Sequence, residues 1–233
     1  MNNLPPPSFS FLQFATFDQS YKFLIELVLR DGFDLPEQNC REVFGVAYQL
    51  DTPSVRKELL AVTNIPTDWI KEELAERISG QPINPGTAWR QWPEAFLPRL
   101  SSGRFAYTYA ERMYHQLSNL VSLLRTNPTT RRAILSIWDP KLDSGNHSEV
   151  PCTIMSQYAL RAGSLNSIYY TRSNDCISFL VADVYLYIAI QVWLVDQLGC
   201  KLGTFSHIIG SLHIYDKDLE QAKVLLKHLE GET

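Results

Sequence analysis

The chain has 233 residues, of which 45% are hydrophobic and 12% aromatic, and its formal net charge is −4. This apolar content suffices for one large core, and no linker, charge run or internal repeat divides it, so we expect a single domain over residues 1–233. The acidic balance argues against binding to a nucleic-acid polymer, although a local basic pocket for one phosphate remains compatible with it.

The cysteines and the apolar segments indicate in which cellular compartment the protein acts. The four cysteines, at positions 40, 152, 176 and 200, form no CxxC pair and have no paired histidines, so no metal site is predicted. The start of the chain, around Pro5 to Pro7, lacks the basic and long apolar regions of a signal peptide. The longest apolar run, Val184 to Val195, contains Gln191 and is shorter than a bilayer span. We therefore expect a cytoplasmic protein that contacts no membrane.

Two helices and a strand are predicted in the first eighty residues. Ser20 to Leu29 carries one apolar stripe and is predicted as a helix. Val43 to Leu50 alternates weakly and is predicted as a strand, with Gly45 at a bulge or a point of close approach. A second helix is predicted to begin at a capping residue, either Thr67 or Asp68.

Two features of this region are candidates for a site. The second helix places Glu73 on its apolar stripe, where burial would raise the pKa of the carboxyl, although a boundary glutamate that reaches water is the commoner case. Gln81 to Pro98 contains four prolines with Trp89 and Trp92, and is predicted as an irregular loop. A loop of this length either covers a site or lies on the surface, anchored by its tryptophans.

The middle of the chain predicts further regular elements: a helix over Met113 to Leu124, a strand over Ala133 to Trp138, and a hairpin whose strands are Thr153 to Arg161 and Leu165 to Arg172. Arg131 and Arg132 precede the first of these strands. They converge on one ligand only if one of them lies in a turn, and two solvated arginines are the default. Cys152 is either a small core residue or a nucleophile whose thiolate nearby arginines stabilise.

An anion-binding pattern follows the hairpin. Arg172 offers a five-donor guanidinium beside the hydroxyl of Ser173, a pair suited to phosphate oxygens. Asp183 directly precedes an apolar helix, Val184 to Leu198, so on this segment alone its simplest role is that of the helix N-cap.

The chain is predicted to close with a strand, Thr204 to Tyr215, and a helix, Leu219 to Leu229. His213 and Tyr215 are two residues apart, so on a strand they face the same side. By itself this pair is weak evidence for a site.

Together these segments resemble the thymidylate synthase family, and more closely its phage branch, the deoxycytidylate hydroxymethylases. The motifs that carry the resemblance follow the family's order and nearly its spacing: Asn127-Pro128-Thr129-Thr130-Arg131-Arg132, Pro151-Cys152 with Gln157, Arg172-Ser173-Asn174-Asp175, and Gly210-Ser211-Leu212-His213-Ile214-Tyr215. The first hundred residues match more loosely, through Glu73, Trp89 and Tyr109. The resemblance implies an α+β fold, with a large mixed β-sheet flanked by helices, that pairs sheet to sheet in a homodimer. For a phage-encoded protein, the compartment is the host cell cytoplasm.

The resemblance also implies a folate-dependent one-carbon transfer to C5 of a pyrimidine nucleotide. Cys152 adds to C6 of the base, and C5 then attacks the methylene carbon of 5,10-methylenetetrahydrofolate. Glu73 moves protons through waters. The remaining implied roles are phosphate binding by Arg172, Ser173 and Arg41, with Arg131 and Arg132 of the partner subunit; sugar binding by His213 and Tyr215; support of base and folate by Gln157 and Asp175; and folate contact by Trp89 and Tyr109.

One departure from the family bears on the choice of base. Thymidylate synthases resembling this chain carry Asn eleven residues after the Arg of Arg-Ser-x-Asp, and this chain carries Asp183. Asn matches the N3–H and O4 of uracil. Cytosine presents an N3 acceptor and an N4 donor, and a carboxylate accepts from N4 and shares a proton with N3. The resemblance therefore favours dCMP as substrate, with Asp183 as selector.

Two further departures concern the folate side. Phe179 stands where relatives have Gly, at a place where folate packs closely, and the chain ends at Thr233, soon after Tyr215. A shortened tail is expected to admit water and to favour a hydroxymethyl product over a methyl product. The alternatives that stay open are a dCMP methyltransferase, a CMP hydroxymethylase, a dUMP-acting homologue, and a catalytically silent nucleotide-binding protein.

Overall fold

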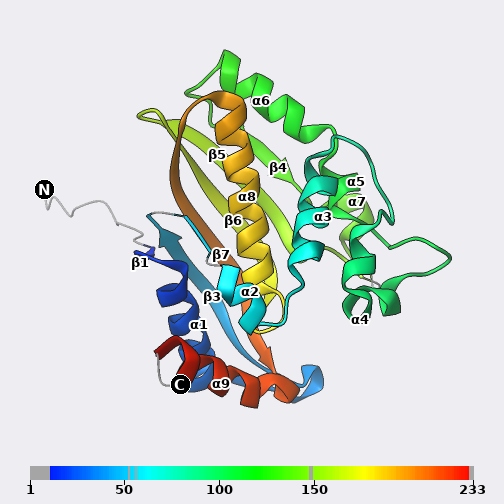
Figure 1. Ribbon diagram of the computed structural model, residues 1–233, viewed down its shortest axis with the longest axis vertical. Coiled ribbons are helices and arrows are strands. Elements are labelled where there is room, and N and C mark those ends of the chain that lie inside the picture. The colour runs from blue at the N-terminus through cyan, green and yellow to red at the C-terminus, as the bar shows by residue number, and fades with distance from the viewer. Residues whose placement is uncertain (1–10, 52, 56, 147–148, 231–233) are drawn as a thin grey trace, which may run out of the picture.

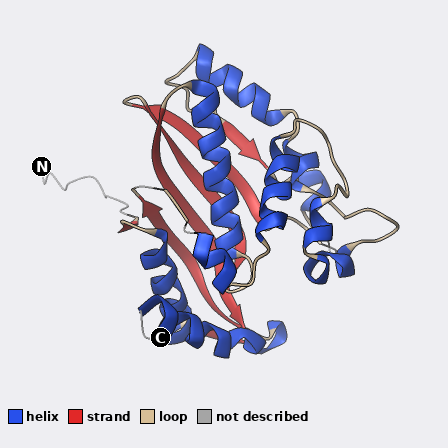
Figure 2. Ribbon diagram, viewed as in Figure 1, coloured by secondary structure: helices blue, strands red, loops and turns tan. Residues whose placement is uncertain are grey.

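A computed structural model describes residues 11–51, 53–55, 57–146 and 149–230. The segment Pro5 to Pro7, on which the signal-peptide prediction depends, lies outside the described residues. One mixed sheet forms the centre, with strand order β1-β3-β7-β6-β5-β4 and β2 beside β3 (Figures 1 and 2). Its strands are β1 (Leu12–Phe14), β2 (Phe33–Leu35), β3 (Cys40–Leu50), β4 (Ile134–Ser136), β5 (Thr153–Arg161), β6 (Ser164–Asp175) and β7 (Lys201–Tyr215).

The strand directions follow from the connections. β5 and β6 form the predicted antiparallel hairpin, and β3 pairs antiparallel with β7. β6 and β7 are parallel, which requires a crossover, and the crossover is the long helix α8 (Leu180–Leu198). The predicted α+β class with a large mixed sheet and flanking helices is confirmed.

The other helices surround this centre. α1 and α9 lie side by side near one end of the sheet, while α3 lies beside α8 and α5 lies beside α3 (Figure 1). The described helices besides α8 are α1 (Phe17–Asp31), α2 (Lys57–Val62), α3 (Thr67–Ile78), α4 (Pro93–Phe96), α5 (Tyr109–Met113), α6 (Gln116–Thr126), α7 (Pro140–Asp143) and α9 (Leu219–Glu230), with the 3₁₀ helices η1 (Pro36–Gln38), η2 (Ala88–Gln91), η3 (Leu97–Arg99) and η4 (Asp216–Asp218).

The core explains the apolar character of α8. Among the described residues, α8 is the one helix long and apolar enough to cross a bilayer, so the expectation that this run was too short is wrong. Its residues instead pack on the sheet: the ring of Tyr187 stacks on that of Tyr169 with centroids 3.9 Å apart, and Gln191 hydrogen-bonds Ser167. The helix is therefore the central core helix of this domain.

The predicted N-termini of two helices that contribute residues to the site differ from the structure. α8 begins four residues before the predicted Val184, its N-cap is Phe179 without a side-chain hydrogen bond, and Asp183 lies within the first turn. The prediction that Asp183 caps the helix is therefore wrong. α3 likewise has Pro66 at its N-cap, without the predicted side-chain cap from Thr67 or Asp68.

Two other local predictions differ from the structure. The predicted helix Met113 to Leu124 is divided into α5 and α6. Gly45 has φ 83°, but the pairing of β3 with β7 keeps its register on both sides of it, so it forms no bulge. The close approach lies at Gly210 of β7, where an added Cβ would sit 2.5 Å from the carbonyl oxygen of Arg172. Only glycine lets β6 and β7 lie this close beside the Arg172 motif.

Candidate active site

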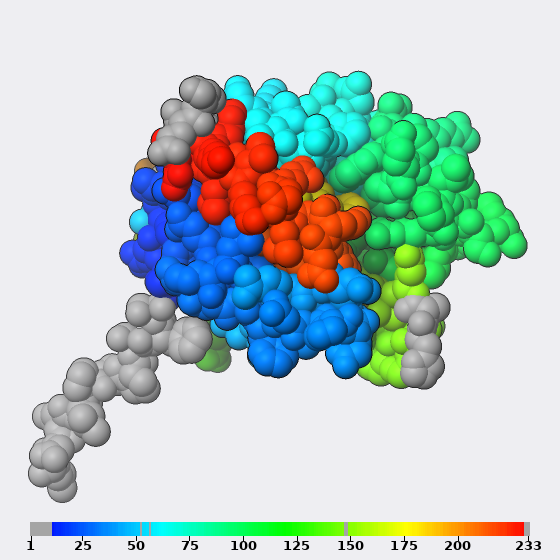
Figure 3. All heavy atoms as spheres, turned by 90° about the horizontal axis from the view of Figure 1, so that it is seen from below, coloured from blue at the N-terminus to red at the C-terminus, as the bar shows by residue number. Residues whose placement is uncertain are grey.

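A cavity of about 560 Å³ opens where β6 and β7 end and α8 begins, and α3, α5 and η3 close its other side. This volume is in the usual range for small-molecule sites. Figure 3 shows the hollow between the end of β7, drawn in orange, and the segment around residues 90–110, drawn in green. Residues far apart in the sequence meet here because the crossover through α8 returns the chain to the same sheet edge.

Cys152 lies directly before β5 and lines the cavity. Its sulfur is 3.9 Å from Nη2 of Arg172. Burial raises the pKa of the Cys152 thiol, whereas the guanidinium of Arg172 acts to lower that pKa. The thiol is thus the resting form, and a cation stands next to the sulfur to stabilise a thiolate once it forms.

The polar wall of the cavity comes from the ends of β6 and β7. Arg172 is held by the backbone, donating from Nε to the carbonyl of Pro151 (2.9 Å) and from Nη2 to that of Val150 (3.1 Å). Asp175 accepts the backbone N–H groups of residues 177 and 178, which fixes the turn into α8. The cavity is also lined by Ser173, Asp175, His213 and Tyr215, the last two with their rings 5.0 Å apart.

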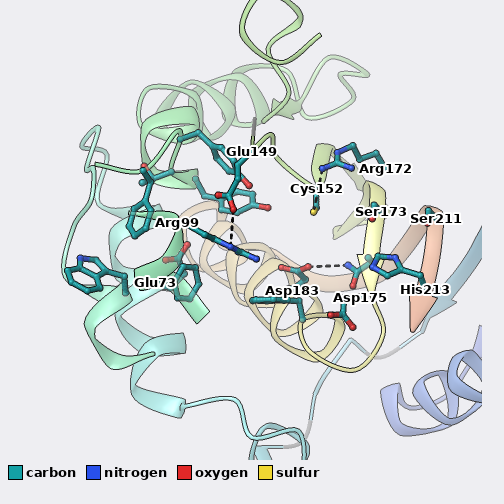
Figure 4. Close-up of a pocket in the computed structure, with 18 of the residues that line it drawn as sticks. Glu73, Arg99, Glu149, Cys152, Arg172, Ser173, Asp175, Asp183, Ser211 and His213 are labelled. Atoms are coloured by element: carbon teal, nitrogen blue, oxygen red, sulfur yellow. Dashed lines mark hydrogen bonds and ion pairs between the residues drawn. The ribbon is translucent and has the colours of Figure 1, made fainter. Parts of the chain in front are cut away.

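Asp183 projects from the first turn of α8 into the same hollow (Figure 4). Nδ2 of the buried Asn174 donates to its Oδ2 at 3.1 Å. Among the described residues no hydrogen bond reaches Oδ1, so that oxygen is left for a ligand. Burial raises the pKa of Asp183 to about 6, while Arg77 and Asn174 oppose the shift. A carboxyl with this pKa both accepts a hydrogen bond and gives a proton near neutrality.

Glu73 enters the cavity from α3, where its Oε1 accepts from Nε of Arg77 at 2.7 Å. The side chain of Glu73 is 16% exposed and that of Arg77 is 2% exposed. The apolar stripe therefore does bury this glutamate, and a cation from the next helical turn compensates its charge.

An aromatic wall faces the polar one. Trp89, Phe96, Phe105 and Phe179 line the cavity, and Phe179 packs on Trp92 with ring centroids 5.4 Å apart. This wall suits a flat bicyclic ring such as that of a folate. Trp89 lies in this wall, and the loop of residues 81–98, which contains short helical segments, contributes Pro85, Trp89 and Phe96 to the lining of the cavity.

Four of the residues nominated from the sequence lie outside the cavity of this protomer. Arg131 and Arg132 are exposed before β4. Nε2 of Gln157 donates to the carbonyl of Arg131, on the face of the sheet turned away from α8. Arg41 points away from the cavity side of β3 and donates to the carbonyls of Leu29 and Gly32. Strand alternation directs the side chains of Arg41 and Gln157 away from the cavity of this protomer.

Other lining residues carried no sequence signal that we recognised. Arg99 of η3 pairs with Glu149 at 3.1 Å beside Cys152 (Figure 4). Tyr107 also lines the cavity, beside the nominated Tyr109, whose hydroxyl is 3.3 Å from that of Thr153. The position of Glu149, three residues before Cys152, and the length of the covering loop were the available signals.

The thymidylate synthase family model matches residues 19–232, nearly the whole described chain. The chain belongs to the thymidylate synthase family. Among curated proteins, one from Methanosarcina barkeri, named "Putative thymidylate synthase", is 32% identical over 152 residues, 60% of this chain and 70% of its own length. A protein of the same name from Methanocaldococcus jannaschii is 25% identical over 214 residues, 88% of this chain and 90% of its own. A Listeria monocytogenes thymidylate synthase is 30% identical over 138 residues, 59% of this chain and 39% of that enzyme.

This membership confirms the resemblance drawn from the motifs and, with it, the cosubstrate. Thymidylate synthases use 5,10-methylenetetrahydrofolate to modify C5 of a pyrimidine nucleotide. None of the relatives reported above bears the name of a deoxycytidylate hydroxymethylase, so closeness to that branch stays a prediction.

Proposed function

We propose that the protein is a dCMP hydroxymethylase, which adds a one-carbon unit to C5 of dCMP and hydrates it to 5-hydroxymethyl-dCMP. The observation that carries the proposal is Asp183: a carboxyl with a pKa of about 6, on the wall of a cavity that also contains a cysteine and a glutamate. Family membership supports the reaction type, and the carboxyl supports cytosine over uracil.

The geometry of Asp183 supports recognition of a cytosine edge. With Oδ2 held by Asn174, the protonated carboxyl has an O–H to donate to N3 and lone pairs to accept from the N4 amino group. Uracil presents the opposite edge, since its N3–H is a donor and O4 an acceptor. The ionised carboxylate would set lone pairs against O4, and that buried repulsion disfavours dUMP.

The chemistry of the chain then follows from three side chains. The Cys152 thiol gives its proton to water, and its sulfur bonds to C6 of the base, which breaks the C5–C6 double bond and makes C5 a nucleophile. The charge that develops on the ring is neutralised when the proton of Asp183 moves to N3. Glu73 is placed to move protons at the exocyclic groups through water.

5,10-Methylenetetrahydrofolate supplies an electrophilic one-carbon unit when bound. In the proposed arrangement Trp89, Phe105 and Phe179 hold its flat ring system. Asp175 and Tyr109 support it from the side of β6 and α5. The phosphate of the nucleotide lies at Arg172 and Ser173, and the sugar at His213 and Tyr215.

The proposal predicts which folate product is released. With dCMP and methylenetetrahydrofolate we expect tetrahydrofolate and a nucleotide heavier than dCMP by a hydroxymethyl group, with no rise in absorbance from dihydrofolate. Methylation requires a hydride from the folate, so stoichiometric dihydrofolate with 5-methyl-dCMP would instead support a dCMP methyltransferase. Replacing dCMP by CMP in the same assay tests the ribonucleotide alternative.

A second candidate is methylation of dUMP, which the printed names of the relatives favour. Turnover of dUMP in preference to dCMP would replace our proposal with that one. A protein that binds either nucleotide without any turnover would be the catalytically silent homologue.

We also propose that two copies pair through the sheet and share their sites. The face turned away from α8 carries half-buried or exposed side chains in register across β4 to β7, among them Ile134, Gln157, Ile168 and Tyr170. A partner on this face would bring the exposed Arg131 and Arg132 to the neighbouring phosphate. Such an enzyme of nucleotide metabolism is expected to act in the cytoplasm.

Mixing two inactive variants tests the shared site. Cys152→Ala and Arg132→Ala subunits should each lack activity, but their hybrid dimer contains one intact site. Random exchange gives roughly a quarter of wild-type activity. The measurement is turnover after mixing, with exchange confirmed by mass spectrometry of tagged subunits. Absence of recovery despite exchange would contradict the shared site.

A further inference from the structure

Arg77 is the one lysine or arginine among the described residues that is buried. It lies on α3 with 2% of its side chain exposed, and it lines the cavity. Its guanidinium carbon is 3.9 Å from the ring centroid of Tyr109 and 5.8 Å from that of Tyr187. Burial of a cation is costly unless charges and hydrogen bonds compensate it. Arg77 is therefore held in place by a specific arrangement.

Only some of the hydrogen-bond donors of the Arg77 guanidinium have a partner. Nε donates to Glu73 at 2.7 Å, whereas the buried Nη1 has no hydrogen-bond partner among the described residues. The guanidinium thus has one donor engaged with Glu73 and another left over at the wall of the cavity. A role confined to holding α3 would not need the second donor.

Asp183 lies one helical turn before Tyr187 on α8, and the ring centroid of Tyr187 is 5.8 Å from the guanidinium carbon of Arg77. Arg77 and Asp183 also line the same cavity. Arg77 acts to lower the pKa of Asp183, against burial and against the nearby Glu73 and Asp175, which act to raise it. One buried cation therefore acts on two carboxyls, one on α3 and one on α8. The charged and titratable groups around Asp183 are Arg77 and Glu73 from α3, Tyr109 from α5, Tyr169 and Asp175 from β6, and Cys152 before β5.

We propose that Arg77 is a positioning residue that fixes Glu73 by hydrogen bonding and sets the charge state of Asp183 through its buried positive charge. This inference rests on the proposed function only for the roles of the two carboxyls, because the coupling itself belongs to the free protein. Its consequence is that the protonated fraction of Asp183 near neutral pH, and hence the strength of base recognition, depends on a residue that does not touch the base.

The coupling can be measured without substrate. In protein labelled with ¹³C at the aspartate carboxyl, loss of a resonance in Asp183→Asn assigns the signal, and its chemical shift is followed against pH. We expect the midpoint near pH 6 in the wild type. In Arg77→Met the midpoint should rise by about one pH unit or more, because the opposing cation is gone. Arg77→Lys keeps the charge and should remain close to wild type.

Arg112→Met is the matched control. Arg112 also forms a buried ion pair, with Nη2 2.8 Å from Oδ1 of Asp143, but neither residue lines the site cavity. Its loss should lower thermal stability while leaving the Asp183 midpoint unchanged. If Arg77→Met does not fold, Arg77→Gln carries the test: it also removes the positive charge while keeping a polar side chain, and it should move the midpoint to higher pH.

A midpoint in Arg77→Met, or in Arg77→Gln, equal to that of the wild type would overturn the inference. A wrong proposed function would give different results from a wrong inference about Arg77. If the enzyme prefers dUMP while the midpoints move as expected, dCMP recognition is wrong and the coupling stands.

Discussion

Asp183→Asn is expected to reverse the choice of base. The variant should lose most of its kcat/KM with dCMP and gain activity with dUMP, because the amide donates to O4 and accepts from N3–H, while cytosine loses the proton for N3. Each mismatched buried contact costs about 1–3 kcal/mol, roughly ten- to a hundredfold. A site built on substrate hydrogen bonds discriminates by as much as about 10⁴-fold, so the combined change is expected to exceed one bond.

The effect should appear mainly in kcat/KM, since the N3 proton is shared only as Cys152 attacks C6. Asp196→Asn is the control, because Asp196 is exposed on the same helix. If the ratio of kcat/KM for dCMP to that for dUMP is unchanged in Asp183→Asn, Asp183 does not select the base. Its role would then be that of a negative charge in the first turn of a helix, where replacement by Asn has a small effect that is independent of substrate.

Cys152→Ala is expected to bind dCMP but to be inactive. Adduct formation at C6 is what activates C5, so turnover should fall by roughly 10⁴- to 10⁶-fold, as for removal of other nucleophiles. Release of tritium from [5-³H]dCMP is the direct measure, because exchange at C5 requires the adduct. The small volume change keeps binding intact, and isothermal calorimetry measures it.

Cys200→Ala is the matched control. Cys200 is a free, half-buried cysteine beyond α8, outside the cavity. It should retain wild-type exchange and turnover. Measurable tritium exchange in Cys152→Ala would contradict the nucleophile assignment.

Much of the fold followed from local patterns in the sequence. The hairpin of β5 and β6 was predictable because Ala162-Gly163 separates two strand-like runs, and both residues have positive φ in the turn. α1 and α9 followed from apolar stripes. The start of α8 did not, because Leu180 to Asp183 lack a capping side chain and the helix is fixed by burial in the core instead.

Among the site residues too, those carried by sequence motifs were predicted, and those positioned by tertiary packing were not. Cys152, Arg172 and His213 were nominated because motifs of the chain carry them, and the start of β5 and the ends of β6 and β7 bring them to the cavity. Arg77 was not nominated, since sequence spacing does not show that Tyr109 of α5 and Tyr187 of α8 lie against its guanidinium. Arg41 was nominated from its place in the sequence, and alternation along β3 turns its side chain toward the carbonyls of Leu29 and Gly32, away from the cavity.

Competition between the two nucleotides tests the central claim most directly. The protein is incubated with equal concentrations of dCMP and dUMP and with methylenetetrahydrofolate labelled with ¹⁴C in the methylene carbon, and the nucleotides are separated. We predict that the label enters 5-hydroxymethyl-dCMP. Label found in thymidylate, with none in a cytosine nucleotide, would contradict the assignment of Asp183 as the selector of cytosine.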